Sequence, residues 1–314
     1  MTEAELIALL RAGATDPAAR DLSDDVAVLD LGDQFLVLTH DMIVEGVHYL
    51  AGDAPGDVAW KLLAVNLSDL AAKGAEPTGV LLGYMLGDDA WDRAFAEGLK
   101  SALSAFNVPL LGGDTVSSHA GAPRTLGLTA IGRCRASPPS RAGAREGDHL
   151  WVTGTIGDAG AGLAVRLGEL ERSEALTERY LNPRPRLEAG QRLAPLVSAM
   201  MDVSDGLLID SQRLAQASGC AVAIALESVP LSQAYLEALG DSRDDRLAAC
   251  TAGDDYELLF AAPPQAAAEI LALADEIGIP CSRIGLVGRG MGVIVLDHGA
   301  VVMLPDRLGF EHRG

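Results

Sequence analysis

The sequence predicts two mixed domains, an N-terminal α+β domain over residues 1–136 and a C-terminal α/β domain over residues 137–314. The chain has 314 residues, which is more than one ordinary core holds and suits two domains. Hydrophobic residues make up 49% and aromatic residues only 4%, a mixture that favours layers of helix and sheet over a sandwich built on aromatic pairs. The segment 135–148, RASPPSRAGAREGD, contains two Pro and two Gly and predicts the linker between the domains.

In the N-terminal half, hydrophobic periodicity predicts a strand-rich layer with two long helices. The period is helical from Pro55 to Lys73, and Gly74 suits the end of that helix. The other expected elements are helices at 2–12 and 90–106, two strands within 26–38 around a Gly-Asp turn, and strands at 79–86, 108–114 and 125–134.

The C-terminal half alternates strand and helix, which favours an α/β domain. We expect GRGMG, residues 288–292, to form a hairpin turn between two strands. The expected strands are 149–154, 199–202, 220–226 and 256–262, with two or more further strands within 283–303. One helix is expected after the Gly-rich turn 154–160, and 171–198 is expected to be helical with a break at 182–186. The remaining expected helices are 207–218, 231–239 and 264–277.

Charge and cysteine content exclude several classes of protein. Lys plus Arg is 24 and Asp plus Glu is 44, so the net charge is −20, which disfavours nucleic acid and anionic lipid as partners. The four Cys are far apart and form no CxxC, which is typical of a reducing compartment. The first residues show no secretory leader, and no apolar run approaches about 20 residues, so we expect a cytoplasmic protein without a membrane span.

Aspartates recur at the ends of the expected elements. Some have an ordinary explanation: Asp25 can serve a turn, Ser204 or Asp205 can cap the helix that follows, and Asp114 can end a hairpin. The aspartates in such positions are Asp24, Asp25, Asp41, Asp69, Asp114, Asp202 and Asp205.

The long helix 55–73 carries a polar stripe that is harder to explain. Asn66, Asp69 and Lys73 follow one another at i, i+3 and i+7, so they share one face of the helix. We expect Lys73 to reach a solvated face, whereas Asn66 and Asp69 lie among apolar neighbours.

Convergence of these aspartates would point to bound metal. Two carboxylates about 4 Å apart repel by roughly 4 kcal/mol at an effective dielectric near 20, so a fold gathers several only if protons or cations offset the repulsion. The six His show no HxxxH spacing, and oxygen ligands without His or Cys clusters favour Mg²⁺ over zinc. Mg²⁺ joins an acidic protein to a nucleoside triphosphate.

The common sequence motifs for phosphate binding and for a catalytic serine are absent. No GxxxxGK[ST] or GxSxG occurs, and the Gly-rich segments 154–160 and 288–292 do not match a dinucleotide fingerprint.

Ten segments, distributed over nearly the whole chain, form a recognisable series. In order they are SDDVAVL, THDMIVEGVHY, WKLLAVNLSDLAAKGAEP, LLGGDT, SRAGAREGD, WVTGTIGDAGAGL, LNPRPR, DVSDGL, GDDYELLF and LGFEH. Taken together, they resemble the thiamine-monophosphate kinase family, in the superfamily of aminoimidazole ribonucleotide synthetase and selenophosphate synthetase. NLSDLAAKGA, DVSDGL and DYEL are the most specific parts of the match.

The resemblance implies an enzyme that transfers the γ-phosphoryl group of ATP to thiamine monophosphate, with several Mg²⁺ ions per site. It also implies a homodimer in which the N-terminal strands of two subunits form a β-barrel, with ATP between the domains of each subunit. The implied metal ligands are Asp25, Thr39, Asp41, Asp69, Asp114, Asp202 and Asp205; the implied ATP contacts are Gly113, Asp114, Arg141 and Ser204; the implied contacts to thiamine phosphate are His48, Asp254 and Phe310. Asp114, Asp205 and Arg141 are the implied catalytic residues.

Three positions depart from the family pattern. Ser23 stands where the family commonly has Gly, His40 where it has a hydroxyl residue, and Asp254 where it has Glu, which is longer by one methylene.

Other functions remain open at this point. Selenophosphate synthetase is disfavoured because the first Cys is Cys134, and aminoimidazole ribonucleotide synthetase is a closer rival. A metal-dependent phosphohydrolase would use the same aspartates on water, and a non-catalytic nucleotide-binding protein would form no product.

Overall fold

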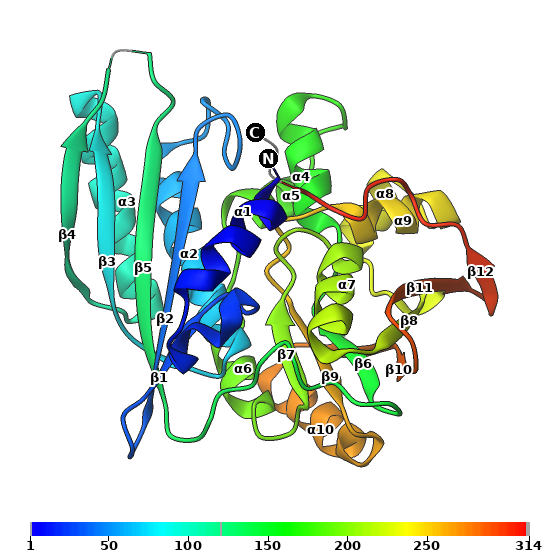
Figure 1. The fold of residues 1–314 in the computed structure, drawn as a ribbon. Helices are drawn as coiled ribbons and strands as arrows, with labels where there is room; N and C mark the ends of the chain where they lie inside the picture. The colour runs from blue at the N-terminus through cyan, green and yellow to red at the C-terminus, as the bar shows by residue number, and fades with distance from the viewer. Residues whose placement is uncertain (1, 120, 312–314) are drawn as a thin grey trace.

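The computed structural model describes residues 2–119 and 121–311, and the strands within them form two separate sheets (Figure 1). The N-terminal sheet has five strands in the order β1-β2-β5-β3-β4, and the C-terminal sheet has seven in the order β12-β11-β8-β10-β6-β9-β7. Both sheets are open in the described part of the chain. The barrel that the resemblance implies needs a second subunit and stays a prediction.

The N-terminal half packs two helices on one face of its sheet. Its elements are α1 Glu3–Leu10, η1 Arg11–Gly13, η2 Pro17–Leu22, β1 Ala27–Asp30, β2 Phe35–Val44, α2 Pro55–Ala72, β3 Glu76–Leu86, α3 Asp89–Phe106, β4 Leu110–Ser117 and β5 Thr125–Cys134. Leu63 of α2 and Leu99 of α3 belong to one buried cluster with Leu126 and Leu128 of β5. On the opposite face of the sheet, Met42, Leu81 and Val116 are 52%, 38% and 53% exposed, so residues 2–119 and 121–311 leave these apolar side chains of that face open to solvent.

Helix α2 is the central element of the molecule. Every residue from Lys61 to Ala72 is buried, because α2 packs on strands of the first sheet, on α3, and on β7 and α6 of the C-terminal half. Proline at its first position and Asp57 in the first turn suit the start of the helix. A helix buried on all sides is normally apolar all round, so polar residues within it need internal partners.

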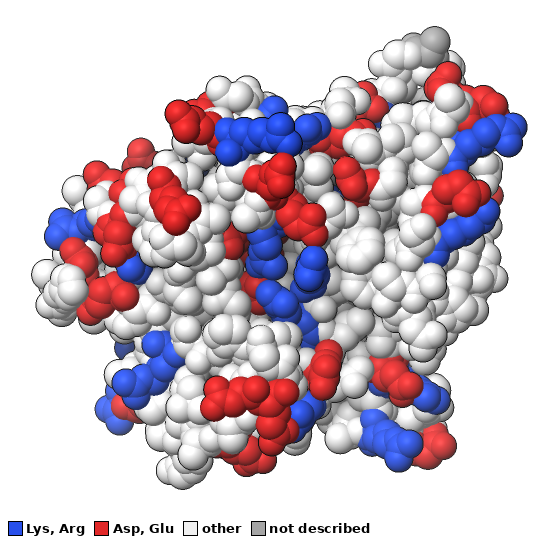
Figure 2. All heavy atoms as spheres, turned by 180° about the vertical axis from the view of Figure 1, so that it is seen from behind, with Lys and Arg blue, Asp and Glu red and all other residues white. Residues whose placement is uncertain are grey.

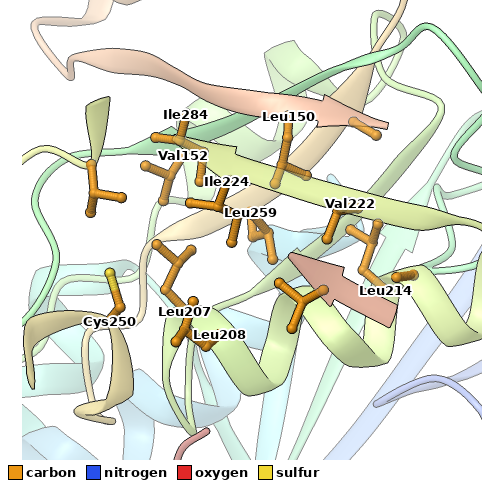
Figure 3. Close-up of a cluster of buried hydrophobic side chains, with 14 of the residues drawn as sticks. Leu150, Val152, Leu207, Leu208, Leu214, Val222, Ile224, Cys250, Leu259 and Ile284 are labelled. Carbon is orange, nitrogen blue, oxygen red and sulfur yellow. The ribbon is translucent and has the colours of Figure 1, made fainter. Parts of the chain in front are cut away.

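The C-terminal half is an α/β layer structure with helices on both faces of its sheet (Figure 1). Its elements are β6 His149–Thr153, α4 Asp158–Leu167, α5 Glu174–Leu181, α6 Leu187–Leu193, β7 Ala199–Asp202, α7 Leu207–Ser218, β8 Ala221–Ala225, η3 Leu226–Ser228, α8 Gln233–Ala238, α9 Arg243–Thr251, β9 Leu258–Ala262, η4 Pro264–Ala266, α10 Ala267–Ile277, β10 Cys281–Gly288, β11 Gly292–Asp297 and β12 Ala300–Val302. Leu207, Leu208 and Leu214 of α7 form a buried cluster with Val222 and Ile224 of β8, and Figure 3 shows them together.

Most expected elements are confirmed, and three details differ. GRGMG is not a hairpin turn: β10 and β11 both pair with β8, which lies between them, so the segment crosses from one side of β8 to the other. Strand β2 continues past residue 38 to Val44, pairing with β5 although Thr39, His40 and Asp41 interrupt its apolar pattern. Helix α9 was not expected; Ser242 and Asp245 form a capping box at its start, a signal that the sequence did contain.

The distribution of surface charge and the lengths of the helices can be compared with what nucleic acid or a membrane would require. On the face shown in Figure 2, acidic and basic side chains are interspersed, and basic side chains also gather in a hollow near the middle. Among the described residues, no helix combines the length and apolarity needed to cross a bilayer.

The contact between α2 and α6 generates a stability prediction. A Cβ on Gly190 of α6 would lie 1.9 Å from the Ala71 carbonyl oxygen of α2. We therefore expect Gly190→Ala to lower the free energy of unfolding by about 2 kcal/mol, because the two helices must separate. Urea denaturation followed by circular dichroism measures this. Gly52→Ala is the control, since nothing lies within 4 Å of that Cβ, and equal stability of the two variants would contradict the packing argument.

Candidate active site

A cleft of about 1240 Å³ is lined by residues from both halves of the chain. Its wall includes Asp24, Asp25, Asp41 and Asp69 from the first half and Arg141, Asp202, Ser204 and Asp205 from the second. His40, His48, Asp254, Tyr256 and Phe310 also line it. Of the residues that the resemblance implied, the structure therefore brings all but three into the wall of one cleft: Thr39 lies just behind it, and Gly113 and Asp114 lie elsewhere.

Three carboxylates meet at the base of this cleft. Ligand oxygens of Asp25, Asp69 and Asp202 all lie within 4.8 Å of one another. Asp69 comes from the buried helix α2, and Asp202 ends the buried strand β7, so neither can swing out into water. Oxygen atoms at this spacing are the donors that a hard divalent cation takes.

Hydroxyl and amide groups support the cluster from behind. Thr39 Oγ1 donates to Asp69, and Ser68 Oγ donates to Asp202 Oδ2 at 2.6 Å. Asn66 Oδ1 accepts from the backbone N–H of Asp41 at 2.9 Å, which fixes β2 against α2. The polar residues of α2 thus have internal partners, as burial requires.

Burial and crowding raise the pKa values of three carboxyl groups in and beside the cluster. Burial, together with Asp25 and Asp205, raises the pKa of Asp41 to about 6. Burial and Asp25 raise the pKa of Asp202 to about 7, and burial with three neighbouring carboxylates raises the pKa of Asp69 well above its ordinary value. No ion pair involves these three residues within the described parts of the chain. Within the cluster, only Asp25 has a cationic partner among the described residues, namely Arg141.

The segment after β7 is held by a different mechanism from the one expected. Neither Ser204 nor Asp205 caps α7: the N-cap is Gly206, without a side-chain cap. Instead, Asp210 Oδ2 accepts from the backbone N–H groups of Ser204, Asp205 and Gly206 at 3.1 to 3.2 Å. This leaves the Ser204 and Asp205 side chains directed at the cleft, and Asp205 pairs with Arg213.

Arg141 enters the cleft from the linker. Its Nη2 atom pairs with Asp25, and its Nε atom is buried with no hydrogen-bond partner. Behind it lies Asp24, which is fully buried and has cations on both oxygens, Lys73 and Arg20 each at 2.6 Å. Although burial alone would raise the pKa of Asp24, Lys73, Arg20 and Arg141 lower it to about 2.

The expectation for Lys73 is therefore wrong. Its side chain is completely buried rather than solvated, and Nζ also donates to the Met200 carbonyl at 3.2 Å. The stripe that it shares with Asn66 and Asp69 faces the interior because the C-terminal half covers that side of α2.

A second wall of the cleft carries the residues implied for the thiamine phosphate. Asp254 Oδ2 pairs with Lys61 of α2 at 2.6 Å, and Tyr256 Oη donates to Asp254 Oδ1 at 3.1 Å. His48 Nδ1 accepts from the Val44 N–H at 3.0 Å, and the Phe310 N–H donates to the Asp205 carbonyl at 2.9 Å. His312, the last residue of the closing motif, lies outside the described residues.

Gly113 and Asp114 do not line the cleft of their own chain. They lie on β4, an edge strand on which every residue is exposed. Two strands separate β4 from β2, which carries Asp41, so about 14 Å of sheet lies between them.

Sequence reasoning missed several residues of this site. Lys61, Asp210 and Arg213 are buried or half-buried partners of the expected aspartates. Asp210 and Arg213 are spaced i, i+3 on α7, a recognisable pair, but only the fold shows which carboxylate each cation neutralises.

Comparison with known proteins identifies the family. Family models described as AIR synthase related protein match its N-terminal domain at residues 23–134 and its C-terminal domain at residues 145–297. The thiamine-monophosphate kinase of Caulobacter vibrioides is 42% identical over 306 residues, covering 95% of this chain and 86% of the relative. The enzyme of Salmonella typhimurium is 36% identical, covering 93% and 91%.

Similarity to solved structures indicates the same family. A structure described as AaThiL complexed with AMPPCP and TMP has a TM-score of 0.85 at 30% identity, covering 99% of this chain and 97% of that one. The thiamine-monophosphate kinase of Stenotrophomonas maltophilia K279a has a TM-score of 0.79 at 35% identity, covering 95% and 96%. Because both halves match in order and over nearly their full length, the chain belongs to the AIR synthase related family and, within it, to the thiamine-monophosphate kinases.

Proposed function

We propose that the chain is an ATP-dependent kinase that phosphorylates thiamine monophosphate, giving thiamine diphosphate and ADP in thiamine diphosphate biosynthesis. The observation that carries this proposal is the three-carboxylate cluster beside Arg141 in a cleft between the two halves. Family membership supplies the substrates, since a relative with the same fold binds AMPPCP and TMP.

The cleft residues suit direct transfer. The acceptor is a phosphate oxygen, which is largely ionised at pH 7, so no strong general base is required. Arg141 would bind the polyphosphate of ATP together with Gly113 and Ser204, while His48, Asp254 and Phe310 would hold the thiamine phosphate. Catalysis then consists mainly of positioning and charge neutralisation.

The carboxylate cluster fits Mg²⁺. Its donors are oxygens, the pKa values of Asp69 and Asp202 are raised, and neither of these two forms an ion pair among the described residues, so a divalent cation would relieve the repulsion. Asp25, Thr39, Asp41, Asp69, Asp202 and Asp205 would hold the ions in one chain. When bound, the ions supply positive charge to the phosphates.

The exposed face of the N-terminal sheet supports a homodimer. It presents Met42, Leu81 and Val116 to solvent, and the sheet has free edges at β4 and along β2 beyond the end of β1. A second copy would cover the face and pair the edges, as an inter-subunit barrel does. We infer that Gly113 and Asp114 act in the partner's cleft, because they lie outside their own.

Two further assignments are proposals. The domain boundary at residues 136 and 137 is supported by the position of the two sheets and of the two family models on either side of it. A cytoplasmic location is supported by four cysteines that are buried and unpaired.

One assay separates the kinase from its rivals. Incubation with Mg-ATP is expected to yield thiamine diphosphate and ADP only when thiamine monophosphate is present. Free phosphate without acceptor would indicate a phosphohydrolase, and a raised melting temperature without product would indicate a nucleotide-binding protein.

Removal of a cluster carboxylate should separate activity from stability. We expect Asp69→Asn to lower kcat at least about 100-fold, because a metal ligand is lost. The metal-free variant should melt no lower than the wild type, since carboxylate repulsion is relieved. Activity and thermal unfolding with and without Mg²⁺ measure this, with Asp30→Asn on the exposed β1 as control. Near-normal turnover of Asp69→Asn would contradict the metal assignment.

The raised pKa values predict a pH dependence. With the pKa of Asp41 near 6 and that of Asp202 near 7, the folded metal-free protein binds more protons than the unfolded chain above about pH 4. The stability from these groups is therefore present at low pH and lost as the pH rises through 6 to 7. We expect the melting temperature of the metal-free protein to fall from about pH 5.5 to about pH 7.5, and Mg²⁺ to reduce that fall. An equal slope with and without Mg²⁺ would count against the site.

Mixed dimers test the placement of Asp114. A dimer of one Asp114→Asn protomer and one Asp69→Asn protomer, purified through two affinity tags, has one intact cleft if Asp114 acts in the partner. We expect about half of wild-type activity, while each parent homodimer is inactive. Inactive mixed dimers would show that Asp114 acts in the cleft of its own chain, and an active Asp114→Asn homodimer would show that Asp114 is not needed for catalysis.

A further inference from the structure

Asp24 is a buried carboxylate whose bonding partners come from its own segment and from the end of α2. Lys73 Nζ, at the end of α2, lies 2.6 Å from Asp24 Oδ1, and both side chains are completely buried. Arg20 Nη1 lies 2.6 Å from Asp24 Oδ2. The Asp25 N–H also donates to Oδ1 at 3.1 Å. Both oxygens of Asp24 are thus occupied, and two full positive charges face one negative charge.

Arg141 lies against this occupied carboxylate without bonding to it. Its Nε atom is 3.9 Å from Asp24 Oδ1, the oxygen that Lys73 holds, and is one of the few buried polar atoms without a partner in the described part of the chain. A buried guanidinium N–H that lacks a partner is costly, and a carboxylate next to it is the partner it ordinarily takes. Lys73 prevents that pairing by occupying Oδ1.

Arg20 acts on Arg141 through the backbone as well. Its guanidinium donates to the carbonyls of Pro138 and Pro139, at 2.9 and 3.1 Å, in the segment that leads into Arg141. The same side chain therefore occupies the second oxygen of Asp24 and fixes the start of the linker.

We propose that Lys73 and Arg20 are positioning residues: by saturating Asp24 they keep Arg141 from hydrogen bonding to it, so that Asp25 holds the guanidinium at the cleft, where it meets the anionic phosphates of the nucleotide. This rests on the proposed function, in which Arg141 binds ATP. Without Lys73, Oδ1 of Asp24 gains a vacant lone pair, and a small rotation of Arg141 brings Nε from 3.9 Å into hydrogen-bond distance of it, while Nη2 stays with Asp25 and Arg20 stays on Oδ2. Arg141 would then be held between two carboxylates and turned away from the phosphates.

The test measures the affinity of the full-length protein for AMPPCP with Mg²⁺ by isothermal titration calorimetry. We expect Lys73→Met to bind the analogue about 10- to 100-fold more weakly, the range typical of losing a charge-assisted hydrogen bond. Lys73→Arg should retain most of the affinity, since it can still occupy Oδ1. The affinity for thiamine monophosphate, whose contacts lie on the other wall, should not change. Lys100→Met is the control, because that lysine is exposed and its ion pair is with the equally exposed Glu97.

A double-mutant cycle distinguishes positioning from a merely structural role. If Lys73 acts through Arg141, Lys73→Met should cost no further affinity in an Arg141→Met background. If Lys73 only stabilises the fold, the loss should be the same in both backgrounds. The proposal is overturned if folded Lys73→Met binds the analogue within twofold of wild type, or if the two losses add.

Arg20→Met provides the second variant. The Arg20 side chain is 17% exposed, so it tolerates replacement better than the fully buried lysine. If Lys73→Met does not fold, the cycle between Arg20→Met and Arg141→Met decides the question by the same criteria. If the wild-type protein fails to bind AMPPCP, the proposed function fails instead, and the two failures are thereby distinguished.

Discussion

Repulsion among crowded carboxylates is the constraint on which the rest of this structure depends. Asp25, Asp69 and Asp202 are held within 4.8 Å of one another by the turn before β1, the buried helix α2 and the buried strand β7. At such spacing each pair opposes folding by a few kcal/mol. The fold tolerates this because Arg141 pairs with Asp25, while Asp69 and Asp202 retain protons in the absence of metal, as their raised pKa values indicate.

The protein sorts its acidic residues into two groups. Asp24, Asp205 and Asp254 have resident cations, namely Lys73 with Arg20, Arg213, and Lys61. The carboxylates of Asp69 and Asp202 accept from the hydroxyls of Thr39 and Ser68, and Asp41, Asp69 and Asp202 form no ion pair among the described residues. The first group is already neutralised without metal, and the second is where an incoming cation gains most. This division locates the metal position better than the number of aspartates does.

The sequence predicted the elements and the site residues with unequal success. Periodicity located α2 and its polar stripe, since Asn66 and Asp69 stood among apolar neighbours. It misjudged Lys73, because a single helix does not reveal what covers its polar side. It left Ser204 or Asp205 open as the cap of α7, whereas Asp210 holds that segment from inside the helix. The prediction of a hairpin at 288–292 was wrong for a similar reason: β8, which is distant in sequence, lies between β10 and β11.

The sequence by itself determined the α+β and α/β character, the family, and the residue types of an oxygen-ligand site. These follow from local periodicity and from motifs that keep their order along the chain. Only the tertiary structure decided which carboxylates meet, which cation neutralises each of them, and that Asp114 lies outside its own cleft. Those facts depend on contacts between residues far apart in sequence, such as Lys73 with Asp24 and Ser68 with Asp202, which no local pattern records.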